Sequence, residues 1–338
     1  MFDQETPPLN TTMTTTTQTT RRHILQAAAA GLTAGTLPRA FAQSGTVKFI
    51  LPVSAGSGVD GIVRAASSQL GKALGMTAVV ENQPGAGGIV GTQNLIKAAP
   101  DGNTLSFVSN NHVIYPSVTK NLSFDPIADI TPIAVVAYTP LVLIVNAKLP
   151  AKDLREFVAL LKSAPGKYNY ASSGNGTILH LAPELFKDVT GTFSTHIPYR
   201  GFAPMLQDIV SGQVDWGVSA LPAALAQIKA GTVRGLCIPM AQRSPAAPDI
   251  PTSLEAGVPA DQIDAWIAAV GPKGLPAAQV QKINAAIKTA FDAPEVKEAM
   301  ARQGNIVGIT SPEATAEHFK KELARYAALM KKAGVVPA

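Results

Sequence analysis

The sequence has 338 residues, of which 46% are hydrophobic and 15% charged, with a formal net charge of +5. This length is enough for two lobes, each around its own core. Beyond the N-terminus the basic residues are scattered, and their longest runs are the pairs Lys320-Lys321 and Lys331-Lys332, which argues against a nucleic-acid partner. Cys237 is the only cysteine, so no internal disulfide forms, and the ligands for a Cys/His metal site are lacking.

The first 42 residues have the features of an export signal. Arg21-Arg22 precedes an apolar stretch that runs from Ile24 to Leu37, and Ala40 and Ala42 flank Phe41. This pattern predicts a twin-arginine-type signal that is cleaved near Ala42/Gln43. The apolar stretch is too short for a membrane span, which needs about 20 residues. We therefore expect a periplasmic protein of the Gram-negative type.

Strand-like and helix-like runs alternate along the rest of the chain. Expected strands cover 47–53, 77–82, 104–110, 132–138, 141–147, 168–173, 193–199, 214–220 and 234–240. Expected helices cover 62–74, 88–99, 154–161, 178–189, 203–210, 279–291, 294–303 and a segment opened by Ser311-Pro312. Such alternation predicts an α/β fold with parallel sheets.

Two such α/β sets predict two lobes with a ligand cleft between them. We expect lobe 1 to comprise residues 43–144 plus 267–338, and lobe 2 residues 145–266. The chain would cross between them near 140–147 and 264–272, and these crossings would act as hinges.

Four glycine-rich loops, each between a strand and a helix, are the candidate site. They cover 52–60, 82–88, 172–177 and 198–204. In parallel α/β sheets, loops of this kind lie at the carboxyl ends of the strands, where ligands bind. Helix N-termini present free N–H groups there, and glycine lets the backbone approach closely. The loops therefore predict an anion site, and the first two contain neither lysine nor arginine.

A dinucleotide site is the alternative interpretation of the first loop. Gly56, Gly58 and Gly61 spell G-x-G-x-x-G, and Glu81 follows at the usual distance. Against this, the carboxylate of Asp60 would repel a pyrophosphate, and three residues separate the strand from the first glycine. The corresponding function is an exported α/β oxidoreductase that binds a dinucleotide. His112, His180 and His196 are possible partners for a serine nucleophile, but each also suits a structural hydrogen-bonding role.

Eight motifs together resemble one family. In chain order they are P-V-S-A-G-S-G-V-D, V-V-E-N-Q-P-G-A-G-G, A-A-P-D-G-N-T-L, F-D-P-I-A-D-I-T-P, S-S-G-N-G-T-I-L-H-L, H-I-P-Y-R-G, S-G-Q-V-D and P-D-I-P-T-S-L-E-A-G-V-P. The chain resembles the solute-binding proteins of tripartite tricarboxylate transporters, also called the Bug family, over residues 45–335.

The resemblance implies a fold and a function. The fold is a two-lobed α/β periplasmic binding protein of type II, or Venus flytrap, with its ligand cleft between the lobes. The function is capture of a small carboxylate (a di- or tricarboxylate, an aromatic acid or an acidic amino acid) for membrane transporter subunits. It implies a monomer without catalysis, cofactor or metal. A ligand-sensing partner of a membrane kinase is a further alternative.

The family's first loop usually reads P-x-x-x-G-G-x-T-D. Gly56 and Asp60 match it, whereas Ser57 replaces the second glycine and Val59 the threonine. The matching motifs and glycine loops supply the expected ligand-binding residues, which are Ser54, Ala55, Gly56, Ser57, Asp60, Gly85, Ala86, Gly87, Asn110, Ser173, Gly176, Thr177, His180, Tyr199, Arg200 and Asp215.

Overall fold

A computed structural model describes residues 45–258, 263, 265–332 and 337. The expected export signal and its cleavage site therefore lie outside the described residues. Within the described part of the chain, no helix has the length and apolar character that a membrane crossing requires.

The first sheet has six strands in the order β11-β4-β10-β3-β1-β2. These strands are β1 (Thr46–Leu51), β2 (Thr77–Asn82), β3 (Thr104–Ser109), β4 (Ile130–Thr139), β10 (Ala265–Pro272) and β11 (Ile306–Val307). β1 pairs in parallel with β2 and β3, whereas β10 runs antiparallel between β3 and β4. Phe49 and Phe107 make an edge-to-face contact at 5.4 Å between ring centroids in the core of this sheet.

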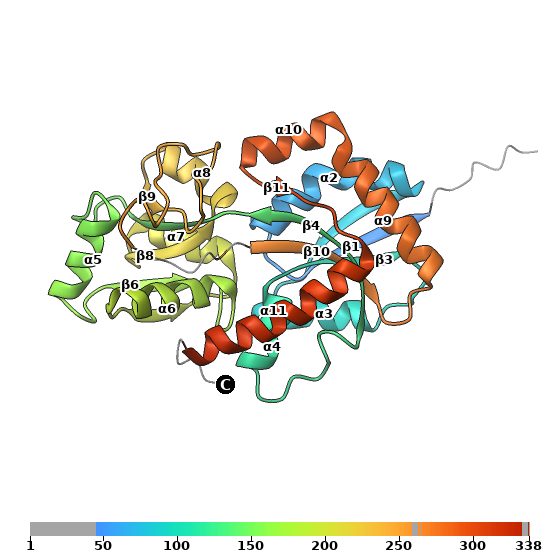
Figure 1. The fold of residues 1–338 in the computed structure, drawn as a ribbon, viewed down its shortest axis with the longest axis horizontal. Coiled ribbons are helices and arrows are strands. Elements are labelled where there is room, and N and C mark those ends of the chain that lie inside the picture. The colour runs from blue at the N-terminus through green and yellow to red at the C-terminus, as the bar shows by residue number, and fades with distance from the viewer. Residues whose placement is uncertain (1–44, 259–262, 264, 333–336, 338) are drawn as a thin grey trace, which may run out of the picture. The chain divides into compact units, whose positions relative to one another are not determined.

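Six α-helices and one 3-10 turn accompany the first sheet in the described part of the chain. They are α2 (Gly58–Leu74), η1 (Ala86–Gly88), α3 (Ile89–Ile96), α4 (Asn111–Val118), α9 (Ala277–Asp292), α10 (Pro294–Gln303) and α11 (Pro312–Lys332). Ile62 and Leu70 of α2 and Ile283 and Ile287 of α9 belong to one buried cluster. The C-terminal helix α11 packs against β4 and α4 (Figure 1).

The second sheet has five strands in the order β7-β6-β8-β5-β9. They are β5 (Leu141–Asn146), β6 (Asn169–Ser172), β7 (Thr195–Pro198), β8 (Trp216–Ala220) and β9 (Val233–Cys237), and they alternate with α5 (Leu154–Ser163), α6 (Ile178–Thr190), α7 (Phe202–Ser211) and α8 (Leu221–Lys229). The buried indole of Trp216 contacts the rings of Phe157, Tyr170 and Phe186 at centroid distances of 5.2–5.6 Å.

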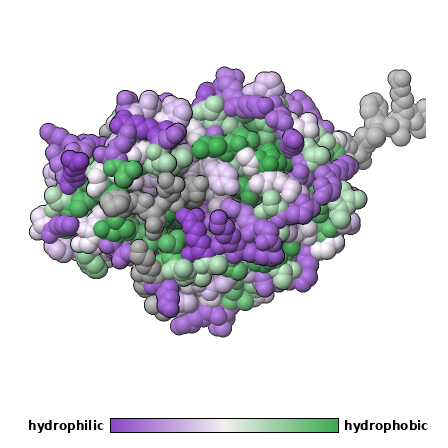
Figure 2. All heavy atoms as spheres, in the orientation of Figure 1, coloured by the Kyte–Doolittle hydropathy of each residue, from purple (hydrophilic) through white to green (hydrophobic). Residues whose placement is uncertain are grey.

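The chain passes between the sheets beside Pro140, where β4 ends and β5 begins, and returns to the first sheet at β10. Figure 1 shows the two sheets on either side of this crossing. The result is a mixed α/β fold with two lobes. On the face shown in Figure 2, hydrophilic residues and groups of hydrophobic residues alternate.

The expectation of parallel sheets is only partly correct. The parallel parts are β1–β2–β3 and β6–β7–β8, in which helical crossovers connect the strands. β5 and β10 enter their sheets directly from the other lobe and pair antiparallel with their neighbours. The parallel strands end at the cavity, whereas β5 and β10 begin there, at Leu141 and Ala265, and so run in the opposite direction.

Both tryptophans are buried and each donates one hydrogen bond, which makes them a matched pair. Trp266 Nε1 donates to Glu322 of α11 at 3.1 Å, and Trp216 Nε1 donates to the Ser194 hydroxyl at 3.2 Å. A bond to a charged acceptor contributes about 1.5–3 kcal/mol, against about 0.5–1.5 kcal/mol for a neutral one. We expect Trp266→Phe to lower the free energy of unfolding more than Trp216→Phe, as measured by urea denaturation. Equal losses would show that the Glu322 bond does not hold α11 on β10.

Candidate functional site

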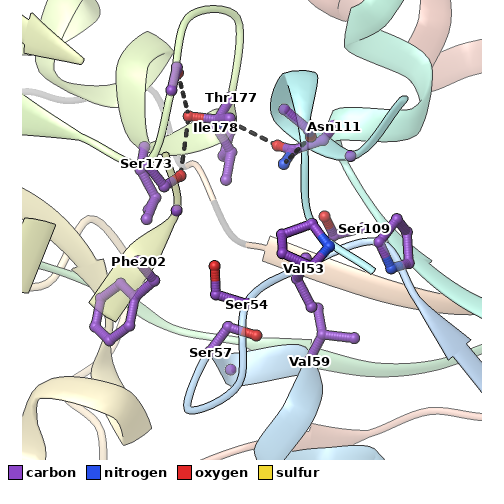
Figure 3. A pocket seen from close by; sticks show the side chains of 18 of the residues that line it. Val53, Ser54, Ser57, Val59, Ser109, Asn111, Ser173, Thr177, Ile178 and Phe202 are labelled. Atoms are coloured by element: carbon purple, nitrogen blue, oxygen red, sulfur yellow. Dashed lines mark hydrogen bonds between the residues drawn. The ribbon is translucent and has the colours of Figure 1, made fainter. Parts of the chain in front are cut away.

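A cavity of about 620 Å³ lies between the two sheets. All four glycine-rich loops reach it: the first two follow β1 and β2 of one sheet, and the other two follow β6 and β7 of the other. Figure 3 shows Ser54, Ser57 and Val59 on one side of the open space and Ser173 and Phe202 on the other. The parallel parts of both sheets therefore direct their carboxyl ends to one place.

The backbone around this cavity suits an anion. Helices α2, α6 and α7 begin at the lining residues Gly58, Ile178 and Phe202. The first N–H groups of a helix have no intrahelical acceptor and carry a partial positive charge. Among the hydrogen bonds of the described residues, none uses the N–H of Gly58, Val59, Ala86 or Gly87. These donors remain available to a bound carboxylate.

Arg200 is the one charged side chain among the described residues that line the cavity. It is exposed, and the ion pairs of the described residues do not include it. An exposed charge at the edge of a cleft raises the association rate of anions more than it raises affinity.

Asp60 organises the first loop from behind. Its side chain is buried and accepts bonds from Gly56 N and Asn82 Nδ2, both at 2.9 Å, and from Arg64 Nε at 2.8 Å. The Ser57 hydroxyl in turn accepts from Asp60 N at 3.3 Å. The carboxylate is therefore balanced by Arg64 and fixes the loop, and it does not line the cavity.

Glycine at position 88 allows the second loop to pack against the first. Its φ is +115°, and a Cβ there would lie 2.7 Å from the Pro52 carbonyl oxygen and would overlap the Tyr115 hydroxyl. Gly58 has a comparable role between the lobes, because a Cβ there would lie 3.0 Å from that of Ala220. Close packing thus accounts for a glycine that belongs to the dinucleotide fingerprint.

Asn111 joins the two sides of the cavity. From the start of α4, its Oδ1 accepts a bond from Ile178 N of α6 at 2.9 Å, and its Nδ2 donates to the Gly87 carbonyl at 3.4 Å (Figure 3).

Sequence reasoning selected the neighbouring Asn110 instead. Asn110 Oδ1 accepts from Trp266 N at 3.0 Å, and its amide group bonds the Tyr326 hydroxyl, so it ties the core together. Ser109 at the end of β3 and Asn111 at the start of α4 both line the cavity, and the turn between strand and helix, which the sequence pattern did not resolve, decides that Asn111 faces it.

Two stacked imidazoles support the third loop from below. The rings of His180 and His196 lie 4.1 Å apart, His180 Nδ1 accepts from Gly176 N at 3.1 Å, and His196 Nε2 lies 2.6 Å from the Ser172 hydroxyl. Burial lowers the pKa of His180, and burial together with the neighbouring His180 lowers the pKa of His196 to about 3. Both rings are therefore neutral near pH 7 and act as hydrogen-bonding supports.

The structure brings one group of the expected site residues to the cavity and places the rest around it. The lining group is Ser54, Ser57, Gly85, Ala86, Gly87, Ser173, Thr177, Tyr199 and Arg200. The residues that do not line it are Ala55, Gly56, Asp60, Asn110, Gly176, His180 and Asp215. Asp215 accepts from Asn169 N at 2.7 Å and so fixes the start of β6. Sequence reasoning missed Asn111 and the apolar lining residues Leu141, Phe202 and Ile267.

The described residues contain no cluster of three or more His, Cys, Asp or Glu side chains that suits a metal ion. Ser172 is buried beside His196, and neither residue lines the cavity. The Ser–His pair therefore has no access to a ligand in this cavity.

The chain belongs to the tripartite tricarboxylate transporter receptor family, whose model matches residues 62–335. This is a family of solute-binding receptors and not an enzyme class. The Bug-family resemblance that the motifs carry is thereby confirmed.

Solved structures of similar proteins share the fold. The periplasmic binding protein BugD is 30% identical, with a TM-score of 0.83 over 87% of this chain and 99% of that one. MatC from Rhodopseudomonas palustris with bound malate is 30% identical, with a TM-score of 0.79 over 84% and 98%. The R. palustris protein Rpa4515 with adipate is 29% identical, with a TM-score of 0.84 over 90% and 100%. The two-lobed periplasmic binding protein fold expected from the sequence is confirmed.

The histidine stack makes stability depend on pH. Because the pKa of His196 is lower in the folded chain than its usual 6.5, the unfolded chain binds more protons below pH 6.5. The contribution of His196 to stability is therefore fully present above pH 6.5 and is lost as the pH falls toward 3, with a slope below about 1.4 kcal/mol per pH unit because the ring is only half-buried and solvent screens it. We expect His196→Gln to reduce this slope in urea denaturation between pH 6.5 and 4.5. The exposed Lys162→Gln variant is the control, and an unchanged slope in His196→Gln would contradict the neutral stack.

Proposed function

We propose that this protein is a periplasmic receptor that captures a small carboxylate between its two lobes and delivers it to the membrane subunits of a tripartite transporter. The observation that carries the proposal is the cavity itself, where helix N-termini and glycine loops offer unused N–H donors beside one exposed cation. Relatives with this fold hold malate and adipate, which are both small carboxylates.

The carboxylate would bind in the first lobe. Its oxygens would accept bonds from the N–H groups of Gly58 and Val59 at the start of α2 and of Ala86 and Gly87 in η1. The hydroxyls of Ser54 and Ser57 are further donors at the same edge of the cavity. Hydrogen bonds to a charged acceptor contribute about 1.5–3 kcal/mol each, so a few of them suffice for tight binding without a buried cation.

Closure of the lobes would complete the site. We propose two lobes that hinge near 140–147 and 264–272. The first boundary falls beside Pro140 and not at 144 as expected from the sequence, because β5, from Leu141 on, belongs to the sheet of the second lobe. The Asn111–Ile178 bond and the close approach of Gly201 to the Ser54 side chain would be among the contacts that closure forms. Binding would then favour the closed state because the ligand contacts both lobes only there.

The remaining features follow from this role. The twin-arginine-type signal, cleaved near Ala42/Gln43, would export the chain, which would act as a monomer.

Catalysis is not part of the proposal, because the Ser172–His196 pair does not reach the ligand. The test compares calorimetric binding of a carboxylate and of its uncharged amide, phenylacetate and phenylacetamide. Binding of phenylacetate alone would support a receptor, whereas chemical conversion of either compound would favour the oxidoreductase alternative.

Gly87 and Gly75 provide a matched test of anion capture. Their φ values are +69° and +70°, but Gly87 lines the cavity, whereas Gly75 ends α2 and a Cβ at that position would have nothing within 4 Å. Valine strains both positions equally, while only Gly87→Val displaces an N–H donor and fills space at the site. We expect Gly87→Val to weaken adipate binding about 10- to 150-fold in calorimetry. Gly75→Val should bind adipate as tightly as the parent protein does. Equal adipate affinities for the parent, Gly87→Val and Gly75→Val would show that the second loop is not part of the binding site.

A further inference from the structure

The body of the cavity is apolar and comes from both lobes. Val59 of α2 and Ile267 of β10 line it from the first lobe, and Leu141, Ile178 and Phe202 from β5, α6 and α7 line it from the second. These five residues are all less than 9% exposed, so the fold fixes them in place. Figure 3 shows Val59 and Phe202 on opposite sides of the space that the serine hydroxyls enter. A ligand that spans the cavity therefore contacts hydrocarbon on both sides.

Three of the hydroxyls that line the cavity beyond the first loop already donate to the protein. Thr139 Oγ1 donates to Asn305 Oδ1 at 2.9 Å, Tyr199 Oη donates to Asp208 Oδ2 at 2.7 Å, and Thr177 Oγ1 donates to the Gly174 carbonyl at 2.8 Å. Each has therefore given its only hydrogen to the protein. A second carboxylate along the body of a ligand would lose water there without a donor from these three hydroxyls in return, and a ligand hydroxyl would find them only as acceptors.

The charge of the site points the same way. A tricarboxylate brings three negative charges, and the cavity offers one exposed guanidinium beyond the N–H donors of the first lobe. Burying several charges with few partners costs more than their attraction returns. A ligand with one carboxylate at the N–H loops, and at most a second that reaches Arg200, satisfies the site.

We propose that the ligand is an organic acid with an apolar body, either a hydrocarbon chain or an aromatic ring, and that Val59 sets this preference. The inference rests on the proposed function, since it takes the N–H loops as the carboxylate site. Val59 stands at the start of α2, next to the proposed carboxylate, so its methyl groups contact the first carbons of the ligand body. Threonine at this position has the same shape and adds a donor at the place where a 2-hydroxyl group of the ligand would lie.

A calorimetric panel on the mature protein tests the preference. The ligands are phenylacetate and adipate, with apolar bodies, malate and citrate, with hydroxyl groups, and phenylacetamide, which has no charge. We expect phenylacetate or adipate to bind at least about 10-fold more tightly than malate and citrate. If malate or citrate bound as tightly as both phenylacetate and adipate, the preference for an apolar body would be wrong, while the proposed function as a carboxylate receptor would still stand. Phenylacetamide binding as tightly as phenylacetate, or no binding by any of the four acids, would overturn both.

Two isosteric variants assign the preference to Val59. We expect Val59→Thr to reduce the ratio of adipate to malate affinity about 10-fold. Val63→Thr is the control, because Val63 is fully buried one turn further along α2 and does not line the cavity. It should change stability but not the affinity ratio. An unchanged ratio in Val59→Thr, or equal changes in the two variants, would contradict the role of Val59.

Discussion

The proposed anion site depends on N–H groups of two loops that are close together, rigid and free of partners among the described residues. Those donors belong to the first turn of α2 and to η1, and they stay free because helix geometry gives them no backbone acceptor. Their approach requires glycine at position 88, where any side chain would collide with Pro52 and Tyr115. The parallel strands β1 and β2 place both loops at one edge of the sheet.

Rigidity comes from residues that stand behind the loops. Asp60 holds the backbone of Gly56 and is itself held by Arg64 and Asn82. In the second lobe, His180 accepts from Gly176, and the neutral stack with His196 keeps that acceptor in place. Preorganised donors avoid the entropy cost of ordering a loop on binding, so in the proposed site these supports would contribute to affinity without touching the ligand.

The sequence indicates the site well where local chemistry decides it. Glycine clusters after strands locate the four loops, and all four reach the cavity, because a parallel βα unit leaves little choice of position. The helices α4 and α8 were missed: α4 contains Pro116, and α8 is short and rich in alanine, so neither shows a clear apolar period. The antiparallel insertion of β10 depends on where the chain returns from the second lobe, which no local pattern encodes.

Individual side chains were harder to assign because tertiary contacts decide which way they point. Asp60 and Asp215 lie in matching motifs, yet both turn inward to hold backbone N–H groups. Asn110 and Asn111 differ by one position along the chain, and only the second reaches across to α6. The apolar wall of Leu141, Phe202 and Ile267 resembles ordinary core in the sequence, since burial and cavity lining select the same residue types.

The central claim is that neutral backbone donors, and not a cation, hold the carboxylate. The most direct measurement is an amide ¹H–¹⁵N spectrum of the protein titrated with adipate. The account predicts that the N–H protons of Gly58, Val59, Ala86 and Gly87 move downfield together as each donates a hydrogen bond to a carboxylate oxygen. Amides that stay in place at these four positions, while the Arg200 guanidinium signal moves, would contradict it.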